Sequence, residues 1–83
     1  MNIKVDNWYR FRGKNWNMKA ITPTNDGRYM FHVISLTAIL KLDPNAFPPH
    51  TDISLNSEMV IIQSEHLQGL VQEGPDESEP PDV

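Results

Sequence analysis

The sequence lacks several residue types and patterns on which common protein functions depend. It contains no cysteine, so a disulfide framework, a thiolate metal site and a cysteine nucleophile are excluded. Its four glycines are isolated and form no glycine-rich phosphate-binding loop, and the nucleophile pattern Gly-x-Ser-x-Gly does not occur. A body of about 70 residues also rarely spares the volume of a catalytic pocket. We therefore expect a protein that is not an enzyme and that uses no cofactor.

Long apolar runs are absent as well. The longest falls far short of the roughly 20 residues needed to cross a bilayer, and no signal-peptide pattern opens the chain. With 83 residues, of which 39% are hydrophobic, the chain can close one small core and not two. We expect a single-domain, soluble and cytoplasmic protein that makes no membrane contact.

Cations are missing from the second half of the chain. Residues 1–41 hold all seven Lys and Arg beside two Asp, whereas residues 42–83 hold nine Asp and Glu and no cation. Five of these nine acids fall in residues 73–83, where three prolines and few apolar side chains leave little to offset the entropy of ordering. We predict a folded domain over residues 1–72 and a disordered acidic tail over residues 73–83.

The first third of the chain has the pattern of strands joined by turns. In residues 3–12 the odd positions are mostly apolar and the even positions mostly charged, with a break near Asp6-Asn7, which is typical of a half-buried strand. Residues 13–15 favour a turn, and residues 16–22 and 28–34 favour a second and a third strand. Between them, residues 23–27 (PTNDG) give the clearest turn signal, because proline presets φ and Asp-Gly tolerates positive φ. The sequence thus predicts a hairpin about this turn, with Tyr29, Phe31 and Val33 on one face of the returning strand.

Residues 35–42 fit two structures. Leu36, Ile39 and Leu40 have helical spacing and Ser35 is a suitable N-cap, whereas residues 38–42 also fit a strand that continues after a bulge. We favour the strand and leave the helix open.

The remaining segments are short. Residues 43–50 contain three prolines and predict a loop. Residues 53–55 predict an edge strand and residues 59–62 a buried one. Residues 64–69 predict one helical or 3₁₀ turn that Ser64 caps and Gly69 ends, and residues 70–71 a closing strand.

Together these elements predict a mainly β fold. Short strands, regular turns and one helical turn near the C-terminus favour a small, single-domain antiparallel β-barrel of the SH3-like or OB-like type, since closure removes the exposed edges of so small a sheet. No family motif supports this architecture, which rests on the pattern alone.

The alternation in the first strand places cations and indoles on one outer surface. Cations attract phosphates by counterion release, and an exposed ring offers a stacking surface to an unpaired base. The sequence therefore predicts a non-enzymatic module that holds single-stranded nucleic acid on an N-terminal cationic and aromatic face, with a modulating acidic tail. The candidate binding residues are Lys4, Trp8, Arg10, Arg12, Lys14, Trp16, Lys19 and Arg28.

Other interpretations stand beside this one. Cations on an outer face are often merely solvated, and a register slip of one residue turns Trp8 into the core. A rival function is a protein-interaction module, such as an inhibitor or adaptor encoded by a phage or mobile element, that contacts a host protein through the acidic C-terminal half and the loop Phe47-Pro48-Pro49. That loop also suits the role of a plug for one end of the barrel, which we favour. The oligomeric state stays open, a homodimer included.

The three histidines do not have metal-ligand spacing. His32, His50 and His66 are 18 and 16 residues apart, with no i, i+4 pair and no cysteine to complete a zinc set. We expect no metal site.

Overall fold

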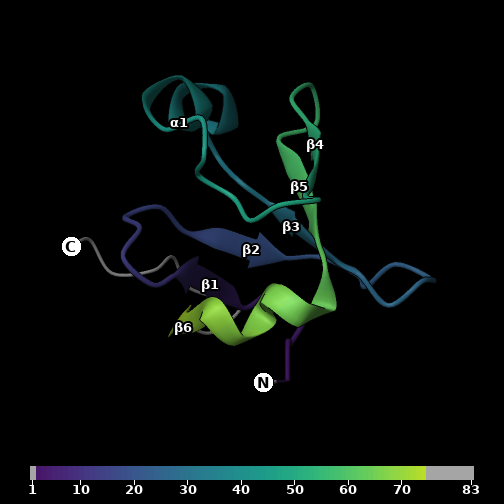
Figure 1. Ribbon diagram of the computed structural model, residues 1–83. Helices are drawn as coiled ribbons and strands as arrows, with labels where there is room; N and C mark the ends of the chain where they lie inside the picture. The colour runs from purple at the N-terminus through teal and green to yellow at the C-terminus, as the bar shows by residue number, and fades with distance from the viewer. Residues whose placement is uncertain (1, 75–83) are drawn as a thin grey trace.

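The computed structural model describes residues 2–74 and forms one six-stranded sheet (Figure 1). Every neighbouring pair of strands is antiparallel, in the order β4-β5-β3-β2-β1-β6. Along the chain the elements are β1 (Trp8–Phe11), β2 (Met18–Ala20), β3 (Tyr29–His32), helix α1 (Leu36–Leu42), β4 (Asp52–Ser54), β5 (Met59–Ile62), the 3₁₀ helix η1 (Ser64–Gly69) and β6 (Leu70–Gly74). The mainly β, antiparallel fold is therefore confirmed. The sheet is not closed, however, and β4 and β6 form its two edges, so the predicted barrel is not confirmed.

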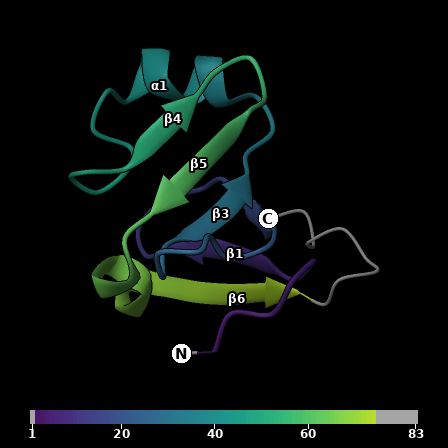
Figure 2. The same cartoon turned by 90° about the vertical axis from the view of Figure 1, so that its right-hand side faces the viewer.

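The sheet is strongly bent around a small core. In Figure 1, β4 and β5 run upright while β1 and β2 run across the view, and Figure 2 shows α1 beyond one end of the sheet, near β4. The inner face carries the fully buried side chains, with the Tyr9 and Phe31 rings in an edge-to-face contact at 6.0 Å between centroids. The cluster of buried side chains comprises Tyr9, Met18, Ala20, Phe31, Val33, Leu36, Val60, Ile62, Leu67 and Leu70.

The predicted alternation of inward and outward side chains in the first strand is confirmed. Tyr9 is fully buried, whereas Trp8 and Arg10 lie on the opposite, outer face. Strand pairing extends this outer row, because Trp8 is opposite Lys19 and Lys19 is opposite His32. The regular strand begins only at Trp8, after a turn in which Asp6 has a φ of 70°.

The predicted hairpin is confirmed, with shorter strands than expected. β2 and β3 pair through Lys19 with His32 and Ala20 with Phe31. In the turn, the Thr24 amide donates to the Arg28 carbonyl at 2.9 Å, and Gly27 takes a φ of 84° that suits glycine.

The strand prediction for residues 35–42 is wrong, since Leu36–Leu42 is the helix α1. A helical turn directs Leu36, Ile39 and Leu40 to one side, where Leu36 is buried and the other two pack against the core. A strand would instead separate Ile39 from its two neighbours. Ser35 is the N-cap residue, as the helical alternative predicted, but it has a φ of 64° and its side chain makes no capping hydrogen bond.

The later elements follow the prediction closely. The edge strand β4 is displaced by one residue, to Asp52–Ser54, and β5 alternates between buried and half-buried positions instead of being buried throughout. The 3₁₀ turn is confirmed over Ser64–Gly69, but Gln63 and not Ser64 is its N-cap. β6 continues to Gly74, two residues into the predicted tail, and the rest of that tail, residues 75–83, lies outside the described residues.

The helices are short. Within residues 2–74 none is long and apolar enough to cross a membrane.

Candidate functional site

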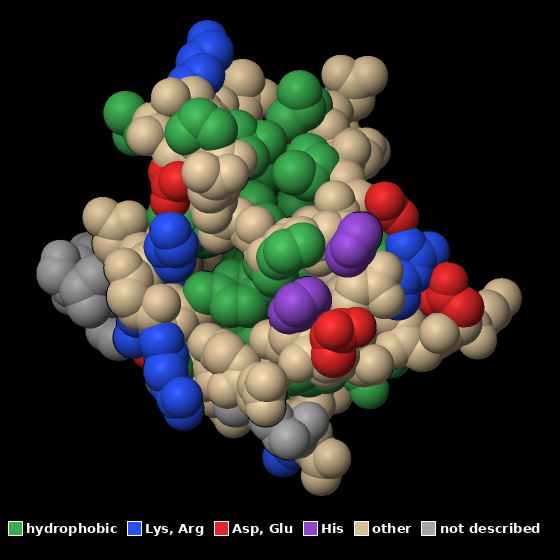
Figure 3. Space-filling model, viewed as in Figure 1, with side chains coloured by type: hydrophobic (Ala, Val, Ile, Leu, Met, Phe, Trp, Pro, Cys, Tyr) green, Lys and Arg blue, Asp and Glu red, His purple; other side chains and the backbone are tan. Residues whose placement is uncertain are grey.

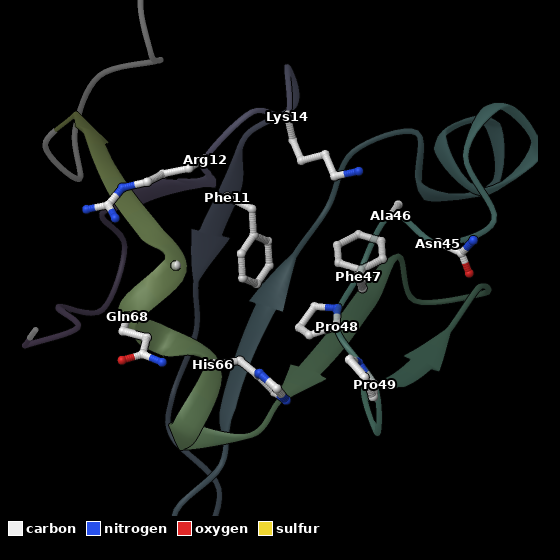
Figure 4. A pocket seen from close by; sticks show the side chains of 11 residues that line it. Phe11, Arg12, Lys14, Asn45, Ala46, Phe47, Pro48, Pro49, His66 and Gln68 are labelled. Atoms are coloured by element: carbon white, nitrogen blue, oxygen red, sulfur yellow. The ribbon is translucent and has the colours of Figure 1, made fainter.

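An open groove with a volume of about 740 Å³ lies between three segments that are distant in sequence. Its walls are the end of β1 with the following turn, the loop between α1 and β4, and the 3₁₀ helix η1 (Figure 4). Two phenylalanines and two prolines are among its apolar lining residues. Gly69 lies close to one of them, because a Cβ on Gly69 would be 3.5 Å from the Phe11 ring. The lining residues are Phe11, Arg12, Lys14, Asn45, Ala46, Phe47, Pro48, Pro49, His66, Gln68 and Gly69.

The loop that forms one wall is held by its own backbone and by an aromatic contact. The Asp43 amide donates to the Ile39 carbonyl at 2.8 Å and so ends α1, and the Ala46 amide donates to the Asp43 carbonyl at 3.0 Å. Ala46 is 3% exposed, which anchors the loop. The Phe47 ring then packs against Trp16, with 5.8 Å between ring centroids, and against the core.

This contact bears on the two roles considered for Phe47-Pro48-Pro49. Phe47 packs inward as a plug would, while Pro48 and Pro49 line the groove, and Pro49 is exposed. The loop therefore combines an anchoring residue with two residues that line the groove.

The charged side chains that line the groove are both cations. Arg12 is exposed, and Lys14 forms an ion pair with Asp43 at 2.7 Å. The hydrogen bond from Lys14 lowers the pKa of the Asp43 carboxyl. Figure 3 shows apolar side chains at the centre of this face, with Lys and Arg along its left side and histidines to the right. The groove thus offers an apolar floor with positive charge on one side.

A second hollow of about 630 Å³ lies on the other side of Lys14, next to α1. Trp16, Ile34, Ile39 and Leu42 contribute its apolar lining. Leu42 is 88% exposed and Ile34 58%, so an apolar surface continues past the groove without a cover from residues 2–74.

The structure divides the predicted nucleic-acid residues among several places. Trp8, Arg10 and Lys19 share the outer face, where the Lys19 ammonium lies 5.9 Å from the centroid of the Trp8 ring. Arg10 is already engaged there, because its guanidinium forms an ion pair with Glu73 at 3.3 Å and donates to the Lys14 carbonyl at 3.1 Å.

The other predicted residues do not join this face. Arg12 and Lys14 line the groove, and Lys4 lies in the irregular segment before β1, where its amide donates to the Tyr9 hydroxyl at 2.9 Å. Arg28 is at the hairpin turn and is paired with Asp26 and Asp52.

Trp16 also lies away from the outer face. It packs against Phe47 and the core, and its indole nitrogen is buried without a hydrogen-bond partner among the described residues. Its ring therefore supports the loop that carries Phe47 and is not on the outer face with Trp8.

Six groove residues were not among the predicted ones, namely Phe11, Asn45, Ala46, His66, Gln68 and Gly69. The sequence around them predicted only local structure, namely a strand that ends near Phe11 and a helical turn over residues 64–69. Only the antiparallel pairing of Phe11 with Leu70 brings these two segments together, and a single sequence does not reveal that pairing.

The histidines lie apart. His66 lines the groove, and the imidazole of His32 is 3.8 Å from a carboxylate oxygen of Glu58. Within residues 2–74 no three side chains of a ligating type are grouped so that they could hold a metal ion.

Comparison with protein-family models, with curated proteins and with solved structures gives no match to this chain.

Proposed function

We propose that this protein is a non-enzymatic interaction module whose groove binds an extended, proline-containing and acidic segment of a partner protein. The observation that carries the proposal is the lining of the groove, which combines Phe11, Phe47 and two prolines with the cations Arg12 and Lys14. This is the protein-interaction alternative of the sequence analysis, with the binding surface moved from the acidic half of the chain to the groove.

The chemistry of the lining favours such a segment. Proline-rich chains adopt the extended polyproline II helix before they bind. Binding to an aromatic-lined groove therefore costs such a chain little conformational entropy. Carboxylates on the same segment would pair with Arg12, which makes no ion pair within residues 2–74. The volume of the groove lies in the usual range for ligand sites, about 300–1,000 Å³.

The charge balance explains why a peptide is favoured over nucleic acid. Residues 2–74 carry seven Lys and Arg and seven Asp and Glu, and three of the cations, Arg10, Lys14 and Arg28, are held in ion pairs. Phosphate binding would have to break these pairs before it gained from counterion release.

A binding assay with matched probes tests the proposal. Fluorescence polarisation would compare a short synthetic peptide that contains proline pairs and two aspartates with the same peptide carrying two lysines. We expect the acidic peptide to bind more tightly, and Arg12→Ala to weaken its affinity by about two- to fivefold, the size of one exposed charge pair. Lys41→Ala, on the exposed side of α1, is the matched control and should leave the affinity unchanged. Equal binding of both peptides, or equal effects of the two variants, would contradict the proposal.

Single-stranded nucleic acid is the second candidate, and one observation favours it. The parity of β1 does place the Trp8 ring outward, beside the Lys19 ammonium and Arg10. Labelled oligothymidylate at low salt is the probe, and binding there should fall steeply as salt rises and should be lost in Trp8→Leu. Binding that survives this substitution would have to use another surface.

The relation of the open sheet to a small barrel is also a proposal. We infer that the sheet is an opened variant of a small barrel of the SH3-like or OB-like type. Support comes from the strong bend of the sheet and from the way β1 pairs with both β2 and the last strand, β6, which follows directly on a 3₁₀ turn.

A further inference from the structure

The acidic end of the chain leaves the sheet beside the outer cationic face. Gly74, the last residue of β6, is paired with Trp8, so the described part of the chain ends beside Trp8. The preceding acid already lies on this face: Glu73 forms an ion pair with Nε of Arg10 at 3.3 Å and accepts a hydrogen bond from Nη2 of Arg10 at 3.4 Å. The two side chains are only 17% and 27% exposed, so this contact is partly screened from solvent.

The face itself offers more than this one contact. The Lys19 ammonium lies over the Trp8 ring and makes no ion pair within residues 2–74. Trp8 is half-buried, which leaves part of a flat apolar ring at the surface next to this charge. The pair therefore suits a ligand with alternating carboxylates and flat apolar groups.

Residues 75–83 have this composition. They contain three prolines and four Asp and Glu, and no cation. Proline rings pack well against an indole, and the carboxylates complement the ammonium of Lys19.

The segment is also long enough. Adjacent strands lie about 4.8 Å apart, so Lys19 on β2 is about 10 Å from the end of β6, across β1. Nine extended residues span up to about 28 Å, and the first acids follow Gly74 within two or three residues.

We propose that residues 75–83 dock in cis across the outer face formed by Trp8, Arg10 and Lys19, continuing the contact that Glu73 makes with Arg10. The docked segment places carboxylates on the ammonium of Lys19 and a proline ring on the indole of Trp8. Because the segment is tethered, its effective concentration at the face is in the millimolar range, so it excludes weakly bound anions and admits only tighter ones. This inference is independent of the groove and of the peptide proposed for it.

An NMR comparison of full-length variants tests the docking. The variant Asp76→Asn/Glu77→Gln/Glu79→Gln neutralises the segment and keeps its length and prolines, and Glu65→Gln on η1 is the matched control for loss of a surface acid. In ¹H–¹⁵N spectra at neutral pH, we expect the triple variant to shift the Trp8 indole and the Lys19 amide, and high ionic strength to shift both in the same direction in the unmodified chain. Trp8→Phe assigns the indole signal.

The outcomes separate cleanly. Unchanged Trp8 and Lys19 signals in the triple variant would overturn the proposal, as would equal shifts in Glu65→Gln. Shifts that depend on protein concentration would mean that the segment of a second copy binds, which contradicts docking in cis.

Discussion

Replacement of Phe47 by alanine tests whether the loop after α1 is a structural wall of the groove. The ring packs against the core and lies 5.8 Å from that of Trp16, centroid to centroid. Truncation of a fully buried phenylalanine costs about 3–5 kcal/mol, and an aromatic pair contributes about 0.5–1.5 kcal/mol of that. Because Phe47 keeps part of its surface in water, we expect Phe47→Ala to lower the free energy of unfolding by about 2–3 kcal/mol.

Urea denaturation followed by tryptophan fluorescence measures this change, since Trp16 reports on the same contact. In a domain of this size, the expected loss corresponds to a fall in Tm of about 8–24 °C. Pro49→Ala is the control, because Pro49 is exposed and its replacement should change the stability by no more than about 0.5 kcal/mol. If the two variants were equally stable, Phe47 would not anchor the loop, and the wall of the groove would have to be held in another way.

Three further predictions follow from single contacts. The hydrogen bond from the Thr24 hydroxyl, together with that from the Arg28 guanidinium, lowers the pKa of Asp26 to about 2. The ionised Asp26 carboxyl therefore stabilises the fold fully above its ordinary pKa of 3.8, and this stabilisation is lost as the pH falls toward 2. An NMR titration should show this low pKa and a rise toward 3.8 in Thr24→Val. Tyr9→Phe keeps the buried ring but removes the acceptor of the Lys4 amide, and should cost about 0.5–1.5 kcal/mol in urea denaturation and speed hydrogen exchange at Lys4. Gly27→Ala has room for its methyl group but not a suitable φ, so thermal denaturation should show a loss of about 1 kcal/mol; a stabilised variant would contradict the turn geometry.

The sequence predicted correctly those elements whose structure depends on neighbouring residues. The hairpin about residues 23–27 was predictable because Asp26-Gly27 carries its own turn preference. The parity of β1 was predictable because a half-buried strand must alternate, and Tyr9 is fully buried as expected.

The error at α1 has a physical origin. Leu36, Ile39 and Leu40 satisfy a helical stripe, but the segment also alternates well enough to fit a strand. Packing of Leu36 into the core decides between the two, and this contact is tertiary.

The groove could not be predicted because its walls meet through long-range pairing. Phe11 and Gly69 are adjacent only because β1 and β6 form neighbouring strands. Likewise, Arg10 and Arg28 form ion pairs with residues that are distant in the sequence. The number of cations available to a ligand was therefore overestimated from the sequence.

We propose that the groove, and not the outer sheet face, is the principal binding surface. An NMR titration of the full-length protein with the acidic, proline-containing peptide tests it most directly, because each surface has its own reporter amides. We expect saturable shifts at Arg12, His66 and Gln68, with the signals of Trp8 and Lys19 unchanged. Shifts confined to Trp8 and Lys19, or a spectrum that does not respond to the peptide but responds to oligothymidylate, would contradict it.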